Sequence, residues 1–281
     1  MYVFCGMVGR FFDFRRSGGS LTKLVGTVMS ILGTGLVVWE VAGVFPYFLP
    51  FFNSLAGGPR NGYRHLVDSS LDWGQGLPAL KSFMDTEAAK GPAAFQDMGS
   101  RPILYMSYFG MGNPPHHNLT SNDKYEVLHL HSSTSGAAKP RHITEVVVSL
   151  HPGFYAIGAS LLQPVYNSHA PGNWNVHYET QYRQMARFLN RLTTVPEPLL
   201  QALVQGQVPE LHDMQRMLKW IDGFRLGRLC AFFREGEPYA QPSYAFNVYK
   251  IDGGTLKRYL HGPAPVETYK NDIVFLRVSL R

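Results

Sequence analysis

The stretch GGPRNGYRHLVDSSLDWGQ forms residues 57–75 and follows closely on an apolar segment. Its glycines and proline favour tight turns. It also contains two carboxylates, Asp68 and Asp72, with Trp73 and Gln75 beside the second of them. Polar and aromatic side chains are thus crowded together just after an apolar helix would end. We therefore expect residues 57–75 to form a polar site at a membrane face.

Residues 24–52 contain one charged side chain, Glu40, and are otherwise rich in Val, Leu, Ile, Phe and Gly. A bilayer core of about 30 Å needs roughly 20 apolar residues in a helix, and residues 24–45 meet that length. Pro46 and Pro50 are expected to end the helix, because proline disrupts helical hydrogen bonding. The sequence predicts one transmembrane helix with an interfacial exit over residues 24–52.

The residues before this span are mainly basic: Arg10, Arg15, Arg16 and Lys23 stand against Asp13. Positive flanks favour the cytoplasmic side. Residues 1–23 are therefore expected to be a basic cytoplasmic leader and residues 53–281 an extracytoplasmic domain, with a further boundary near residue 196. A cleaved signal peptide is the alternative, but its apolar core is about 7 to 15 residues long, shorter than this run.

Composition indicates a packed globular part, with 16% charged and 13% aromatic residues. Much of the formal net charge of +6 belongs to the leader, and the chain has no zinc-finger spacing or long basic run. Nucleic-acid binding is therefore not expected. The two cysteines, Cys5 and Cys230, would lie on opposite sides of the membrane and would not pair. Cys230 is expected to be a buried apolar residue.

After residue 75, helical and strand-like hydrophobic patterns alternate. Helices are expected over residues 77–90, 178–192, 199–205 and 209–229. Strands are expected over residues 103–109, 125–131, 144–150, 154–162, 245–251 and 273–278. This order favours an α/β fold, in which one N-terminal transmembrane helix is followed by an extracytoplasmic layered α/β domain.

Asp68 and Asp72 lie four residues apart and would face one site in a compact turn. Paired carboxylates perform acid/base chemistry or hold a metal. The alternative, which we favour, is that Asp68 and Ser69 form a local turn, while Asp72 accepts backbone N–H groups near the following helix. Trp73 and Gln75 suit stacking on a sugar ring with hydrogen bonds to its hydroxyls, and equally suit a hinge between domain and membrane.

Histidines at positions 116, 117, 129 and 131 suggest a zinc hydrolase as a weaker alternative. Their spacing does not match a zinc motif, so no metal site is expected. Asn118-Leu119-Thr120 is an N-glycosylation sequon, relevant only in a host that glycosylates proteins. The chain has no P-loop, dinucleotide fingerprint or Gly-x-Ser-x-Gly motif, and no cofactor is expected.

A longer set of blocks carries a family resemblance. They are FPYFLPFFNSLAGGP at residues 45–59, NGY at 61–63, LVDSSLDWGQ at 66–75, SYFG at 107–110, PGFYAIGASLLQ at 152–163 and YAFNVY at 244–249. These blocks resemble the carboxyl-terminal region of bacterial multi-span glycosyltransferases of the dolichyl-phosphate-mannose protein mannosyltransferase type. The resemblance runs from about Pro46 to Tyr249, and the first blocks are its most specific part.

The resemblance implies a GT-C enzyme that transfers a sugar from a polyprenyl-phosphate donor to a glycan or protein acceptor on the outer face. Such enzymes have many membrane helices and a catalytic aspartate in their first outer loop. This chain has one clear span, and Asp13 lies on the predicted cytoplasmic side. The catalytic residue is therefore unknown, and whether the chain is an enzyme by itself stays open.

We expect the chain to be the last membrane helix and outer domain of such a glycosyltransferase, as a fragment or subunit without the catalytic base. Its expected partners are membrane lipid, the sugar donor, the acceptor and a multi-span membrane subunit. Its expected substrate-binding residues are Asp68, Asp72, Trp73 and Gln75. The alternative is a membrane-anchored, non-enzymatic binding or scaffold module, in which residues 57–75 only dock the domain on lipid.

Overall fold

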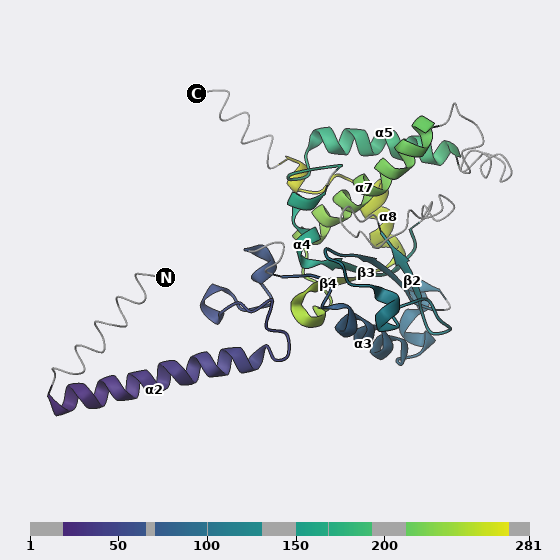
Figure 1. Ribbon diagram of the computed structural model, residues 1–281. Helices are drawn as coiled ribbons and strands as arrows, with labels where there is room; N and C mark the ends of the chain where they lie inside the picture. Colours follow the sequence, from purple (N-terminus) through teal and green to yellow (C-terminus); the bar gives the residue numbers. More distant parts are fainter. Residues whose placement is uncertain are drawn as a thin grey trace, which may run out of the picture.

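A computed structural model describes residues 19–65, 71–99, 101–130, 150–167, 169–192 and 212–269. Within these residues, a long apolar helix, α2 (Ser20–Gly43), projects from a mixed α/β domain (Figure 1). Residues 23–43 of this helix are long and apolar enough to cross a membrane. The helix ends before Pro46, as the sequence predicts.

The domain is built on a four-stranded sheet with the order β2-β1-β3-β4. Its strands are β1 (Ile103–Ser107), β2 (Glu126–His129), β3 (Gly153–Gly158) and β4 (Phe246–Ile251). The strand β1 pairs in parallel with both β2 and β3, whereas β4 runs antiparallel to β3. The two central strands are almost entirely buried. Helices cover both of their faces, which explains their continuous apolar runs.

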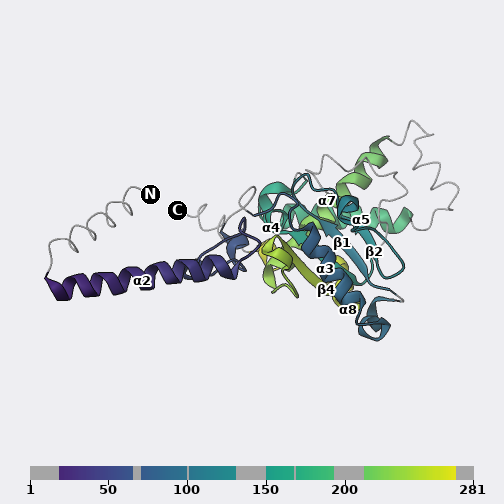
Figure 2. The ribbon, with the colours of Figure 1, turned by 60° about the horizontal axis from the view of Figure 1, so that its bottom comes forward.

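Helices form a layer on each side of the sheet (Figures 1 and 2). On one face, α3 (Leu77–Ala88) buries Leu77, Leu80 and Met84 at helical spacing. On the other face lie α4 (Ala159–Leu162), α7 (His212–Glu235) and α8 (Gly253–His261). Short 3-10 turns complete the described chain at Ser54–Ala56, Gly62–Arg64, Pro92–Met98, Pro114–His117, Pro164–Tyr166 and Pro242–Tyr244.

A buried ion pair joins the outer helices. From α7, the Arg228 side chain donates to Glu179 of α5 (Val176–Leu192) through Nε at 2.9 Å and Nη2 at 3.1 Å. Its Nη2 also donates to the carbonyls of Gly262 and Pro263. Burial alone would raise the pKa of Glu179, but hydrogen bonding and charge from Arg228 lower it. The pair therefore fixes α5 and the end of α8 on α7.

Removing the positive charge of Arg228 should destabilise the domain. Arg228→Met is expected to lower the free energy of unfolding by about 3–5 kcal/mol, because it takes the buried counter-charge away from the Glu179 carboxylate and leaves it with the exposed Arg183 and the neutral Trp174 N–H. Arg183→Met is the matched control: Arg183 also pairs with Glu179, but its side chain is 43% exposed, so a loss below about 1 kcal/mol is expected. Urea unfolding of both variants measures the difference, and equal losses would contradict this role.

The segment that leads from α2 into the domain is held by polar contacts at three points. Gln241 Nε2 donates to the carbonyl of Arg60 at 2.9 Å, and Arg64 pairs with Glu237 at 2.7 Å. The Gln163 amide donates to the carbonyl of Tyr63. Tyr63 is itself buried in the core on the α7 side of the sheet. The segment that follows the carboxyl end of α2 is therefore tied to the domain by several contacts.

Most of the predicted elements are confirmed within the described residues. The helices expected from residues 77, 178 and 209 correspond to α3, α5 and α7, and the strands from residues 103, 125 and 245 to β1, β2 and β4. The strand expected over 154–162 is wrong in its second half, because α4 begins at Ala159. The sequence does not predict α8. The elements expected at 144–150, 199–205 and 273–278 lie wholly or almost wholly outside the described residues.

Candidate functional site

The candidate site lies at the carboxyl ends of β1 and β3. The strands β1 and β3 are neighbours at the centre of the sheet. The chain leaves β1 toward β2 at one edge of the sheet and leaves β3 toward β4 at the other edge, so the strand order changes direction between β1 and β3. In open α/β sheets, ligands bind outside the carboxyl ends of strands at such a switch point. Residues 71–75 lie here: a methyl group added at Gly158, the last residue of β3, would be 2.8 Å from Asp72 Oδ2.

Asp72 is fully buried. Its Oδ1 accepts the N–H of Gly74 at 2.8 Å, whereas Oδ2 has no hydrogen-bond partner among the described residues. Burial raises the pKa of Asp72 to about 7, with the hydrogen bond from Gly74 acting in the opposite direction. Asp72 therefore changes charge near neutral pH inside a closed turn. The favoured sequence interpretation, a carboxylate that accepts a backbone N–H before a helix, matches this geometry.

Trp73 and Gln75 have different surroundings although both side chains reach the surface. Gln75 Oε1 accepts the Trp73 N–H at 2.6 Å, and its Nε2 donates to the carbonyl of Leu71 at 2.9 Å. The Gln75 amide therefore closes its own turn. Trp73 is 49% exposed, and its ring lies 5.7 Å from that of Phe109. Among the described residues of the predicted site, Trp73 is the one whose exposed surface is available for stacking.

Close packing between two turns holds Trp73 in place. A methyl group on Gly110, which has φ of +115°, would lie 2.3 Å from the Trp73 carbonyl carbon. A methyl group on Gly74 would lie 2.7 Å from the backbone nitrogen of Gly112. Met111 lies between these contacts and is 76% exposed. Trp73 and Met111 are thus exposed apolar side chains on two turns whose backbones lie in close contact, and we call this pair the Trp73 platform.

Sequence reasoning missed two buried hydroxyls at the same edge. Ser107 is the last residue of β1, and Ser160 lies in α4 directly after β3. Both are almost completely buried. A serine at the carboxyl end of an otherwise apolar strand was the available signal for Ser107. Asp68, the other predicted carboxylate, lies outside the described residues, so its position relative to Asp72 is not part of the site geometry.

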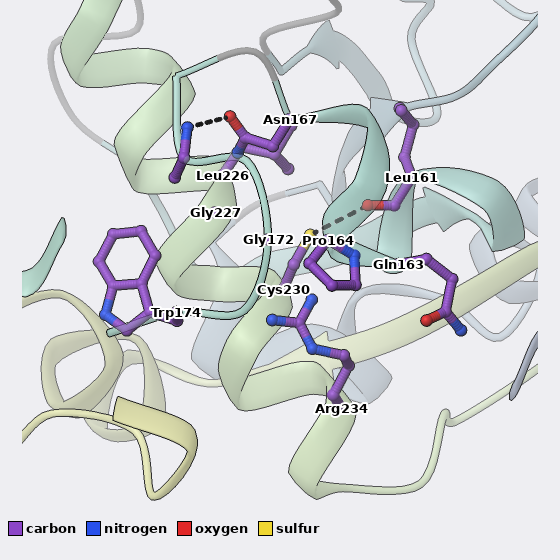
Figure 3. A pocket seen from close by; sticks show the side chains of 11 residues that line it. Leu161, Gln163, Pro164, Asn167, Gly172, Trp174, Leu226, Gly227, Cys230 and Arg234 are labelled. Atoms are coloured by element: carbon purple, nitrogen blue, oxygen red, sulfur yellow. Dashed lines mark hydrogen bonds between the residues drawn. The ribbon is translucent and has the colours of Figure 1, made fainter. Parts of the chain in front are cut away.

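A separate small cavity lies between α7 and residues 161–174 (Figure 3). Its volume of about 20 Å³ is enough for one water molecule and far too small for a sugar. Cys230 lines it and is buried, which raises the pKa of its thiol to about 12. This confirms Cys230 as a buried residue and makes its thiol unreactive.

The histidines do not assemble into a metal site in the part of the chain that is described. There, no group of three or more His, Cys, Asp or Glu side chains could hold a metal ion. His116 and His117 contact each other, with ring centroids 5.4 Å apart. His131, the fourth residue of the zinc hypothesis, lies outside the described residues.

Comparison of the chain with protein-family models, curated protein sequences and solved structures found no match.

Asp72 should make stability depend on pH. Between about pH 4 and pH 7 the unfolded carboxyl ionises while the folded one stays protonated, so the free energy of unfolding falls as pH rises, by on the order of 4 kcal/mol. Asp72→Asn removes this loss. The variant should gain stability over the natural chain as the pH is raised from 4.5 to 8 in urea titrations. The exposed Asp97→Asn is the control, and parallel profiles for all three proteins would contradict the account.

The packing of the two turns is tested with two glycines. Gly110→Ala and Gly99→Ala both place a side chain at positive φ, but nothing lies within 4 Å of a methyl group at position 99. Gly99→Ala should therefore cost about 1–3 kcal/mol from backbone strain. Gly110→Ala should cost at least about 2 kcal/mol more, because its methyl group overlaps the Trp73 backbone. Similar losses in thermal and urea unfolding would refute the close contact.

Proposed function

We propose that this chain is the membrane-anchored outer domain of a polyprenyl-phosphate-sugar-dependent membrane glycosyltransferase, and that it presents an acceptor sugar instead of catalysing transfer alone. In this proposal α2 is the last transmembrane helix, with the N-terminus cytoplasmic and the domain outside. The observation that carries the proposal is the position of the Trp73 platform at the strand ends, on the edge of the domain that receives the chain from α2. The sequence blocks that resemble the transferase family supply the proposed class of reaction.

The properties of α2 support anchoring. Its 24 residues are about 36 Å long at 1.5 Å per residue, slightly more than a bilayer core. Its apolar side chains are exposed, as expected for a helix in lipid. Glu40 lies in the last turns of the helix, and its Oε1 accepts the N–H of Ser54 at 3.1 Å. In this proposal the carboxylate lies at the outer end of the span, where a charge costs less than in the bilayer centre.

The contacts of the connecting segment support a membrane-facing site. The Tyr63 carbonyl accepts a hydrogen bond from Gln163, which follows α4 and the carboxyl end of β3. The Arg60 carbonyl accepts a hydrogen bond from Gln241, which precedes the amino end of the antiparallel strand β4. Both anchor points lie at the same edge of the sheet as Asp72 and Trp73. A ligand at this edge would therefore lie near the membrane face, where a lipid-linked sugar is presented.

The geometry divides the roles of the predicted residues. Trp73 offers an exposed ring for stacking on the apolar face of a sugar, with Met111 beside it. Asp72 and Gln75 shape the turn that carries this ring. No catalytic base is assigned to this chain. Transfer therefore requires a multi-span subunit that supplies the base and binds the donor.

The non-enzymatic scaffold is the second candidate, and one observation favours it. Both polar atoms of the Gln75 amide and one oxygen of Asp72 are engaged within their own turn. A turn that satisfies its own polar groups suits docking as well as recognition. In that case Trp73 would support anchoring and would have no effect on glycan binding.

Trp73→Ala separates the two candidates. The full-length chain in nanodiscs is titrated with mannose- and glucose-containing oligosaccharides, and binding is measured by calorimetry. The proposal predicts that Trp73→Ala weakens binding about tenfold, or about 1.4 kcal/mol, because a stacking surface is lost. Trp220→Ala is the matched control, since Trp220 is also 49% exposed but lies on α7; it should bind normally.

Two outcomes would contradict the proposal. Unchanged oligosaccharide binding by Trp73→Ala, together with weakened membrane association, would favour the scaffold. Sugar transfer from polyprenyl-phosphate hexose by the purified chain without any partner would refute the claim that the chain is incomplete.

A further inference from the structure

A polar groove lies where α2 meets the domain. Its volume is about 320 Å³. On one side it is lined by Gly43 to Phe45 and Tyr47, at the end of α2, and on the other by residues 238–241, 243 and 244. Arg60 completes the lining, and none of the described residues that line the groove is a carboxylate. Among these residues, the formal charge is therefore positive.

The Arg60 side chain is available to a ligand. It is exposed and, in the described part of the chain, its guanidinium makes no hydrogen bond or ion pair. Its backbone is nevertheless fixed, because Gln241 Nε2 donates to the Arg60 carbonyl at 2.9 Å. The nearby Arg64 differs, since it already pairs with Glu237 at 2.7 Å. Arg60 is thus a positioned cation without a protein counter-ion.

The opposite wall of the groove is strained. Ser243 and Tyr244 both adopt left-handed backbone conformations, with φ of +52° and +57°. Neither is glycine, and such strained backbone conformations cluster at ligand sites. Tyr47 and Tyr244 also line the groove, and their hydroxyls have no hydrogen-bond partner within the described residues. These hydroxyls can donate to an anion beside Arg60.

The location of the groove indicates the source of the anion. One wall of the groove is formed by the last residue of α2 and the residues that follow it. In this segment Phe45, Phe48 and Leu49 are exposed. If α2 spans the membrane as proposed above, these residues lie at the lipid–water interface. The groove then lies among lipid headgroups, where an anionic headgroup attracts a basic side chain.

We propose that this groove binds the phosphate headgroup of an anionic membrane phospholipid, with Arg60 as its cation and the Tyr47 and Tyr244 hydroxyls as donors. Such binding would hold α2 and the domain in one orientation. The inference rests on the proposed membrane anchoring by α2, but not on the proposed sugar-binding role of Trp73.

The test uses the full-length chain in nanodiscs of phosphatidylcholine containing a minor fraction of phosphatidylglycerol. After transfer to detergent, native mass spectrometry counts the retained phosphatidylglycerol. The natural chain should retain it preferentially, and Arg60→Gln should reduce retention at least threefold. Arg187→Gln is the matched control: it removes the same charge from an exposed arginine of α5 without a partner in the described residues, and it should behave like the natural chain.

The contradicting outcomes are distinct. If the natural chain enters phosphatidylcholine nanodiscs but shows no preference for phosphatidylglycerol, or if Arg60→Gln retains it normally, the headgroup site is refuted and the anchoring stands. If soluble glycerol phosphate displaces the lipid at equal concentration, the groove recognises free phosphate and the lipid assignment fails. If the chain does not enter the nanodiscs, the anchoring and the headgroup site both fail.

Discussion

Two turns, residues 72–75 and residues 108–112, meet so closely at the carboxyl ends of β1 and β3 that a side chain at Gly74, Gly110 or Gly112 would overlap neighbouring atoms. This contact closes the end of the sheet over Asp72. The carboxyl is removed from water there, and its pKa rises to about 7. The same contact leaves Trp73 at the surface. A buried carboxyl and an exposed indole, adjacent in sequence, thus result from one packing constraint.

The same edge of the sheet also holds the chain that arrives from α2. The backbone carbonyls of Tyr63 and Arg60 accept hydrogen bonds there, close to the two turns. The connection leaves a groove whose cation, Arg60, has no counter-ion in the described part of the protein. We therefore regard residues 60–64 as the attachment of the domain to its helix and residues 71–75 as the support of its proposed binding surface.

Much of the fold follows from periodicity. The long apolar run before Pro46, the helical spacing of Leu77, Leu80 and Met84, and the buried run of β1 each specify their element. The boundary at Ala159 does not, because an apolar run has the same composition in a buried strand and a buried helix. The helix α8 was also missed. It begins with Gly253-Gly254, which suggest a loop, while its N-cap Asp252 is recognisable only once the helix is known.

The candidate site shows a comparable division. The sequence indicates that Asp72, Trp73 and Gln75 belong together, and the structure brings them together in one turn. It does not reveal which of them is available to a ligand, because burial depends on contacts with Gly158 and Gly110, distant in the chain. Strand order likewise depends on such contacts. Local patterns therefore locate the turn, and tertiary packing decides the role of each side chain.

We expect the Trp73 platform to lie on the membrane side of the domain. Spin labels are attached at Met111 and, separately, at the exposed Asp97. In proteoliposomes, the depth of each label relative to the bilayer surface measures which side of the domain faces the membrane. Cys5 is replaced by serine, while the buried thiol of Cys230 does not react with the label. We expect the label at position 111 to lie closer to the bilayer than the label at position 97. Equal depths, or the reverse order, would contradict it.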